Sequence, residues 1–374
     1  MLLRPLSEIV DSYDPHLPLA QAWTIPAAWY VDARVLELER QTVFTRSWQL
    51  VGLAGQLRTS GDFVTFELPG GDPVVVVRGD DGTLRGFFNV CRHHAAAVVT
   101  GPQGSARVLR CPYHGWTYGL DGSLKGTPDF AGVCEFDRNG SGLLPIDVGV
   151  WEHWVFARVD PAGPTLAEWL GTELVRRVAG LNLETLRWME RRSYTVDCNW
   201  KVFVDNYLDG GYHVPHLHKG LGSVLDYSAY TIESGERFCL QSSPMVRDGA
   251  EERTGAVRTG DRASYFWLYP NLMINCYAGA MDTNLVIPRG VDRTEVVFDY
   301  FFDDLSEAGR ARNVASIAVS EQIQDEDVGI CASVQKGLSS RAYTAGRLSV
   351  RREAGEHLFH RLLHADLVAG LGAP

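Results

Sequence analysis

The spacing of hydrophobic residues changes along the chain and predicts helices and strands in separate regions. Between residues 25 and 50 the apolar positions follow helical spacing and end before a glycine-containing stretch. These positions are Val35, Leu36, Leu38, Val43 and Phe44. From Val51 the period becomes two: residues 63–68 alternate, residues 74–77 are β-branched, and Asp81-Gly82 and Asp121-Gly122 are typical of hairpin turns. We therefore expect short antiparallel strands in this region.

The second half of the chain has a mixed pattern. Residues 148–170 combine strand-like segments with Pro161, Gly163 and Pro164, which indicates a domain boundary. Beyond it, residues 166–181 and 308–338 are predicted as helices, and residues 295–302 as a strand. The chain as a whole is therefore expected to be α+β.

Composition places the chain among ordinary globular proteins. Its 374 residues are enough for two domains, and 45% hydrophobic with 22% charged residues is a common balance. A net charge of −11 argues against a nucleic-acid partner, because phosphate binding needs a concentrated basic face. No apolar run approaches the roughly 20 residues that span a bilayer, and the amino terminus lacks a signal-peptide pattern. Irregularly spaced cysteines favour a reducing compartment, so we expect a cytoplasmic protein without a membrane partner.

Two short motifs contain a specific set of metal ligands. Cys91-Arg-His93 is followed, after seventeen residues, by Cys111-Pro-Tyr-His114. Two thiolates and two imidazoles form the ligand set in which two histidines replace two cysteines on one iron of a [2Fe-2S] cluster. Structural zinc is the alternative, but zinc fingers of this composition usually pair the cysteines in one knuckle and the histidines in another. The mixed order favours a cluster that transfers single electrons.

A second group of candidate ligands lies between residues 199 and 220. The pattern is compatible with a helix up to about His213 and is then broken by Pro215. His213 and His218 are five residues apart, so they would not share a face of a continuous helix, but the break would allow both to reach one ion. Two imidazoles and a carboxylate form the facial triad of non-haem Fe(II) oxygenases. His216 competes for a ligand position, and the acidic residues 325–327 offer the carboxylate.

The segments CRHHAAAV and CPYHGWTYGLDGSL resemble the Rieske domain of ring-hydroxylating and related oxygenases. The resemblance implies that Cys91, His93, Cys111 and His114 bind the cluster, with the cysteines on one iron and the histidines on the other. His94 departs from the arginine of many members. It also implies an antiparallel β Rieske domain at residues 46–158 and a helix-grip-like catalytic domain, with a central antiparallel sheet, at residues 159–374. Residues 1–45 would pack with the catalytic domain.

The same family resemblance covers the second site. A Tyr-His pair followed four residues later by His selects His213 and His218, and the segment EDVGICASVQKGL selects Asp327 as the third iron ligand. Asp205 and Asn206 also match the family motif around the iron. Most relatives carry a carboxylate that links the two metal centres at the position of Gly210. Asp209 is therefore the expected bridge, with Asp205 in reserve.

Residues 203–220 and 269–290 are most similar to the choline monooxygenase branch of this family. That similarity implies hydroxylation or oxidative N-demethylation of a quaternary or methylated amine of choline or betaine type. Aromatic faces attract such cations, and the second domain offers several as pocket candidates: Phe238, Tyr265, Trp267, Tyr269 and Tyr277. A ring-hydroxylating oxygenase acting on an aromatic compound is the alternative, and an electron carrier in which only the cluster functions is a more distant one.

The resemblance also implies the partners of the reaction. O2 would be the co-substrate, and a mononuclear Fe(II) would accompany the cluster. The chain has no flavin or nicotinamide fingerprint, so electrons from NAD(P)H would arrive through a separate flavin- or ferredoxin-type reductase. Relatives form head-to-tail trimers in which one subunit's cluster faces the next subunit's iron, which implies a homotrimer.

Overall fold

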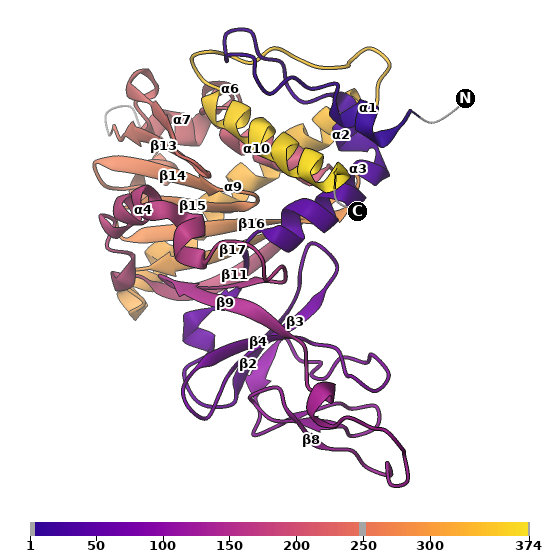
Figure 1. Ribbon diagram of the computed structural model, residues 1–374. Helices are drawn as coiled ribbons and strands as arrows, with labels where there is room; N and C mark the ends of the chain where they lie inside the picture. The colour runs from indigo at the N-terminus through magenta and orange to yellow at the C-terminus, as the bar shows by residue number, and fades with distance from the viewer. Residues whose placement is uncertain (1–3, 247–251, 373–374) are drawn as a thin grey trace. The chain divides into compact units, whose positions relative to one another are not determined.

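The structure is a computed structural model that describes residues 4–246 and 252–372 (Figure 1). The chain divides into two compact units, one formed by Phe44–Trp169 and the other by Met1–Val43 with Leu170–Pro374. No helix in the described part of the chain is long and apolar enough to cross a membrane.

The smaller unit is built from antiparallel strands. One sheet has the order β1-β10-β9-β4-β3-β2-β5, and a three-stranded sheet has the order β6-β7-β8. The strands are β1 (Gln49–Leu53), β2 (Asp62–Glu67), β3 (Pro73–Arg78), β4 (Leu84–Phe88), β5 (Gln103–Ser105), β6 (Leu109–Arg110), β7 (Thr117–Tyr118), β8 (Leu124–Gly126), β9 (Pro145–Trp151) and β10 (Trp154–Arg158). Both predicted hairpins form, because Gly82 (φ 77°) turns β3 into β4 and Gly122 (φ 79°) turns β7 into β8.

The valine run in β3 supplies two cores at once. Side chains alternate between the faces of a strand, so Val74 and Val76 enter one apolar cluster while Val75 and Val77 enter another. The second cluster also contains Cys91 and Cys111. The loops that carry the predicted cluster ligands are therefore anchored in a packed core.

The larger unit is an antiparallel sheet covered by helices. Its strand order is β11-β17-β16-β15-β14-β13-β12. The strands are β11 (Arg187–Val196), β12 (Thr231–Ser234), β13 (Phe238–Pro244), β14 (Arg262–Leu268), β15 (Leu272–Tyr277), β16 (Ala280–Gly290) and β17 (Arg293–Phe302). The helices are α1 (Leu6–Val10), α2 (Ala27–Val31), α3 (Ala33–Glu39), α4 (Leu166–Ala179), α5 (Trp200–Leu208), α6 (Val214–Leu217), α7 (Lys219–Val224), α8 (Glu252–Val257), α9 (Glu307–Leu338) and α10 (Ala354–Leu371).

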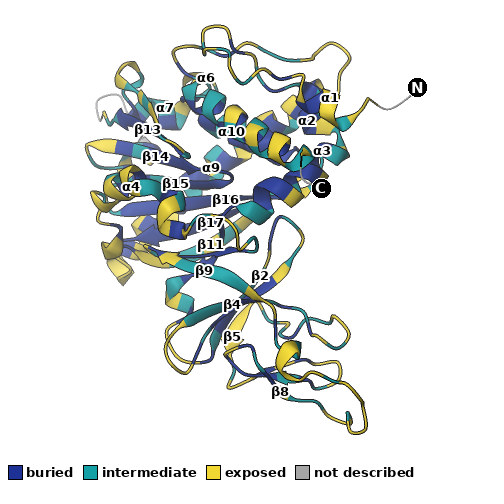
Figure 2. Cartoon of the chain, viewed as in Figure 1, coloured by how far each residue is buried: buried dark blue, intermediate teal, exposed yellow. Residues whose placement is uncertain are grey.

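Helix α5 lies at the centre of this unit. It contacts α9, α10 and β16, and the strands beneath are almost fully buried (Figure 2). Lys201 on α5 forms an ion pair with Glu39 on α3, with 2.6 Å between Nζ and Oε1 and both side chains fully buried. Burial raises the pKa of Glu39 and lowers that of Lys201, while each partner opposes that shift on the other. The pair fixes the start of the helix that leads into the second metal site.

The spacing of hydrophobic residues predicted the fold class and several helices and strands correctly. The α+β class is confirmed, the strand at 295–302 lies within β17, and the helix at 308–338 lies within α9. The helix expected at 25–50 is wrong in extent: it is divided into α2, α3 and a π-helical turn at Arg40–Phe44, and β1 begins at Gln49. Helix α4 contains a non-helical Gly171 (φ 72°).

Candidate metal centres and substrate pocket

The loops that begin at Cys91 and Cys111 in the smaller unit have similar backbone conformations. In the first, the N–H of Cys91 donates to Ala96 (2.8 Å) and the N–H of Ala95 donates to Cys91 (3.0 Å). In the second, the N–H of Gly115 donates to Cys111 (3.1 Å). Ala95 (φ 60°) and Gly115 (φ 73°) both adopt the left-handed conformation, four residues after each cysteine. The two motifs therefore fold into matching tight turns.

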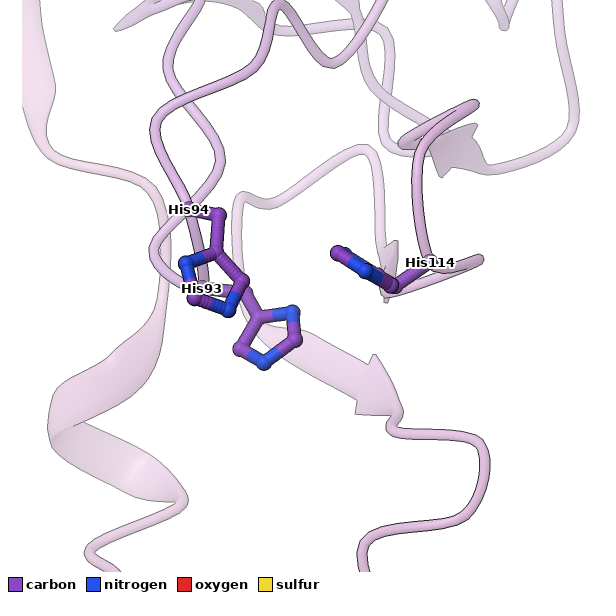
Figure 3. Close-up of side chains that lie close together, drawn as sticks. All are labelled: His93, His94 and His114. Atoms are coloured by element: carbon purple, nitrogen blue, oxygen red, sulfur yellow. The ribbon is translucent and has the colours of Figure 1, made fainter.

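Three imidazoles meet between these loops. His93 and His94 extend from one loop and His114 from the other (Figure 3), and one ligand atom from each lies within 4.8 Å of the others. The His93 ring stacks on Trp116, with centroids 4.7 Å apart. Its Nδ1 is buried without a hydrogen-bond partner in the described structure. Burial, followed by the neighbouring His94 and His114, lowers the pKa of His93, which favours the neutral form that binds metals.

The two predicted cysteine ligands lie on the same loops, outside the cluster of three imidazoles. Cys91 and Cys111 are buried free thiols in the core below the loops. The hydroxyl of Tyr118 lies 3.4 Å from Sγ of Cys91 and accepts a hydrogen bond from the N–H of Arg92 (3.0 Å). Two thiols, together with an imidazole whose buried nitrogen is unpaired, fit the ligand chemistry of a Rieske cluster. His94, which is exposed, is the additional imidazole nearby.

The second site depends on how the chain leaves α5. The helix ends at Leu208, so the predicted continuation to His213 is wrong. Gly210 and Gly211 both have φ 68°, and a Cβ on Gly210 would lie 2.1 Å from the carbonyl oxygen of Arg352. The break therefore falls at the glycines, whereas Pro215 lies in the first turn of α6, where proline is well tolerated.

This turn brings three candidate ligands together. His213 and His218 flank the two ends of α6, and Asp327 comes from α9. One ligand atom from each lies within 4.8 Å of the others. The Nε2 of His218 is 3.1 Å from Oδ1 of Asp327, and the two histidine rings are 4.8 Å apart. Two imidazoles and one carboxylate at this spacing fit a mononuclear Fe(II) site.

Carboxylates orient both histidines of this group. The Nδ1 of His213 lies 2.6 Å from Asp209, and the Nδ1 of His218 lies 2.6 Å from Glu326. Each pair leaves Nε2 available for a metal, which is the usual arrangement around metal-bound histidines. Burial opposes protonation of His218, but Asp327 and Glu326 outweigh it and raise the pKa of this residue. The amide of Asn206 also donates to Asp327 (2.8 Å).

The remaining predicted residues occupy different positions. His216 is exposed and does not belong to the triad. Asp205 accepts a hydrogen bond from Tyr30 (2.5 Å) and lies 3.0 Å from Nε2 of His360. With Glu356, Asp205 and His360 form another group of possible ligands. Asp205 is therefore bonded to groups outside the triad, whereas Asp209 contacts the triad directly.

A cavity of about 110 Å³ adjoins the triad. Its floor comes from one row of the sheet, because Gln241, Tyr265, Asn275 and Asp282 lie opposite one another on neighbouring strands. Asp282 is buried and accepts hydrogen bonds from Asn275 (2.7 Å) and Asn284 (3.3 Å). Burial raises the pKa of its carboxyl group. One side of the cavity is therefore formed by the sheet and contains a buried acidic group.

Only part of the predicted aromatic set lines this cavity. Tyr265 and Tyr277 do, with their hydroxyls 3.0 Å apart, and Tyr207 and Tyr230 join them. These last two tyrosines were not predicted from the sequence, and neither were Asp282 and Arg258. Glu326 was expected only as one of three candidate carboxylate ligands, and its contact with His218 was not predicted.

The other three expected aromatics lie elsewhere. Trp267 packs against Phe359 of α10, with centroids 5.5 Å apart. Tyr269 donates to Asp366 (2.7 Å), and Phe238 is paired with Leu268, which places it on the opposite face of the sheet from Tyr265. Composition could not separate the aromatic residues that line the cavity from those that do not, because their positions depend on the face of the sheet and on the helix that covers it.

Comparisons with known proteins match two domains in this chain. Residues 47–137 match the Rieske [2Fe-2S] domain, and residues 183–367 match the catalytic domain of the ring-hydroxylating alpha subunit. The chain is 41% identical to choline monooxygenase of Arabidopsis thaliana, covering 97% of this chain and 87% of that protein. It is 31% identical to the carnitine monooxygenase oxygenase subunit of Escherichia coli strain K12, covering 92% and 93%.

A solved structure of a quaternary ammonium Rieske monooxygenase is also similar. The TM-score is 0.82 at 27% identity, covering 94% of this chain and 98% of that one. The chain therefore belongs to the Rieske non-haem iron oxygenase α subunits and is a monooxygenase of this family. Within the family it is related to the choline and carnitine monooxygenases, and its two domains imply a [2Fe-2S] cluster and a mononuclear iron.

The contact between Glu326 and His218 predicts a selective loss of iron. Glu326→Ala should weaken binding of the mononuclear iron by about 10- to 100-fold, because His218 loses the group that orients its ring. Iron retained after dialysis against a chelator, together with the visible spectrum of the cluster, measures this effect. Asp325→Ala is the matched control, since Asp325 is adjacent and exposed. Equal iron retention in both variants would contradict the assignment.

Proposed function

We propose that this chain is the oxygenase component of a system that hydroxylates a quaternary or methylated amine, using O2 and electrons from a separate reductase. The observation that carries the proposal is the cavity beside the triad, which is lined by a buried carboxyl group and several tyrosines. The names of the relatives, choline monooxygenase and carnitine monooxygenase, support the same substrate class.

The chemistry of the cavity fits a weakly hydrated cation. Tyrosine faces attract quaternary ammonium groups through their ring quadrupoles, and Tyr207, Tyr230, Tyr265 and Tyr277 line the space. Asp282 adds a buried carboxyl group whose ionised form would attract a cation. An aromatic hydrocarbon would leave this carboxyl group buried against an apolar ligand, which is costly. The cavity therefore favours an amine over the ring-hydroxylation alternative.

Side chains of this protein would hold the two metal groups and orient their ligands. When bound, a Rieske cluster supplies single electrons, and a ferrous ion held by two histidines and a carboxylate supplies O2 activation. We assign Cys91, His93, Cys111 and His114 to the first group and His213, His218 and Asp327 to the second. Asp209 and Glu326 each hold the Nδ1 proton of a histidine, and Asn206 restrains the carboxylate of Asp327. The ligands are thereby oriented before substrate enters.

The proposed reaction inserts one oxygen atom of O2 into a C–H bond of the substrate. The second oxygen leaves as water, which consumes two electrons and two protons. Hydroxylation of a carbon that bears a hydroxyl gives an aldehyde hydrate. Hydroxylation of an N-methyl group gives a hemiaminal, which loses formaldehyde. The reaction products therefore identify which carbon is attacked.

We further propose a homotrimer supplied by a flavin- or ferredoxin-type reductase that draws on NAD(P)H. In this assembly the cluster of one subunit would serve the iron of the next. Inter-subunit electron transfer is described for the quaternary ammonium Rieske monooxygenase of similar structure, which supports the arrangement. Asp209, which contacts His213 and is only partly buried, is the proposed link between the centres.

The substrate class can be tested by coupled turnover. With NADH and a matched reductase, we expect at least one of choline, betaines and methylamines to stimulate O2 uptake, with an aldehyde or formaldehyde formed in proportion. Simple aromatic compounds should give no ring-hydroxylated product. Turnover of an aromatic compound with none of any amine would contradict the proposal.

The role of Asp209 predicts slower transfer between the centres. Asp209→Asn should slow reoxidation of the reduced cluster by O2 and substrate about 10- to 100-fold, because His213 loses its charged partner. Stopped-flow absorbance of the cluster measures this rate. Asp205→Asn is the comparison, since Asp205 is bonded to Tyr30 and His360. An unchanged rate in Asp209→Asn would show that the link lies elsewhere.

A further inference from the structure

The substrate cavity contains a buried cation as well as a buried carboxylate. Arg258, just beyond α8, lines the cavity, and only 5% of its surface is exposed. Its two terminal nitrogens donate to the hydroxyls of Ser316 (2.6 Å) and Ser320 (2.7 Å) on α9. Its guanidinium carbon lies 4.5 Å from the centre of the Tyr277 ring. These contacts orient the guanidinium through neutral groups.

The guanidinium of Arg258 therefore has a hydrogen-bond donor that is not used within the described structure. Its Nε is buried without a hydrogen-bond partner among the described residues. A buried charge is costly unless it is paired, and neutral hydroxyls compensate a guanidinium less well than a carboxylate does. Within the described structure no ion pair joins Arg258 to an acidic side chain. The site resembles one half of an ion pair whose other half is supplied by a ligand.

Asp282 is the acidic group in the same cavity. Its partners are the amides of Asn275 and Asn284, which are neutral. Its charge also acts on Arg258 through space, since Arg258 opposes the rise in the pKa of Asp282. The two side chains nevertheless form no direct ion pair in the described structure. A cavity that holds a guanidinium and a carboxyl group, each hydrogen-bonded only to neutral partners, is complementary to a dipolar molecule.

We propose that the substrate is a zwitterionic betaine whose carboxylate is bound by Arg258 while its ammonium group faces Asp282 and the tyrosines. The proposal rests on the proposed function and narrows its substrate class. Arginine suits this role because its planar guanidinium binds carboxylates with more than one hydrogen bond. Choline carries the same ammonium group but ends in a neutral hydroxyl, so it leaves Arg258 without its counter-charge.

Matched ligands test the proposal by binding alone. Isothermal titration of the iron-loaded protein without O2 should compare choline, glycine betaine, γ-butyrobetaine and L-carnitine. Glycine betaine amide is the critical control ligand, since it keeps the cation and the length of glycine betaine but lacks the anion. We expect the best carboxylate ligand to bind about 10- to 100-fold more tightly than choline, and glycine betaine to exceed its amide, as loss of a charged hydrogen-bond partner predicts.

Variants of Arg258 separate carboxylate binding from general packing. Arg258→Gln should abolish the preference for carboxylate ligands over choline, measured as the ratio of the two affinities, and Arg258→Lys should restore part of that preference. Arg253→Gln is the matched control, because Arg253 lies on α8, is exposed, and also reaches α9 through Gln322 (3.4 Å). It should leave every affinity unchanged.

The outcomes distinguish this inference from the proposed function. Choline binding as tightly as every carboxylate ligand would overturn the inference and leave amine oxidation standing. Equal weakening of choline and betaines in Arg258→Gln would also overturn it, because Arg258 would then act only on packing or on Asp282. If the wild-type protein bound no quaternary amine at all, both proposals would fail.

Discussion

Hydrogen bonds from carboxylates to histidines are the interactions on which the catalytic unit depends. Asp209 and Glu326 each bind the Nδ1 of one histidine. The first contact lies within the turn after α5, and the second joins the end of α6 to α9. Together they hold His213 and His218 close to Asp327. Asn206 adds a contact from α5 to Asp327. The buried pair of Lys201 and Glu39 fixes the other end of α5, and the antiparallel sheet supplies the cavity floor beneath.

Short motifs with fixed spacing could be interpreted from sequence because their chemistry is local. Cys91, His93, Cys111 and His114 lie on two tight turns, so the spacing places one cysteine and one histidine on each turn. The alternation of residues 63–68 and the β-branched run at 74–77 likewise predicted strands. In contrast, the sequence predicts a helix up to about His213, because Pro215 is the stronger helix breaker in the pattern. Two glycines with positive φ end the helix earlier.

The cavity could not be predicted because it depends on register across the sheet. Asp282 and Asn284 stand two residues apart in a strand that is almost entirely buried, a signal that polar groups face the interior. Their partner Asn275 comes from the neighbouring strand, and Arg258 reaches the cavity from beyond α8. Tyr265 and Trp267 share one face of β14, yet Tyr265 lines the cavity whereas Trp267 packs against Phe359 of α10. No local pattern contains this information.

The central claim is that His213, His218 and Asp327 hold the mononuclear iron, and iron content tests it most directly. Anaerobically reconstituted wild-type protein should contain about three irons per chain, two in the cluster and one in the triad. His213→Ala should contain about two, with an unchanged cluster spectrum, whereas His216→Ala should keep all three. Full iron content in His213→Ala, or loss of one iron in His216→Ala alone, would contradict the account.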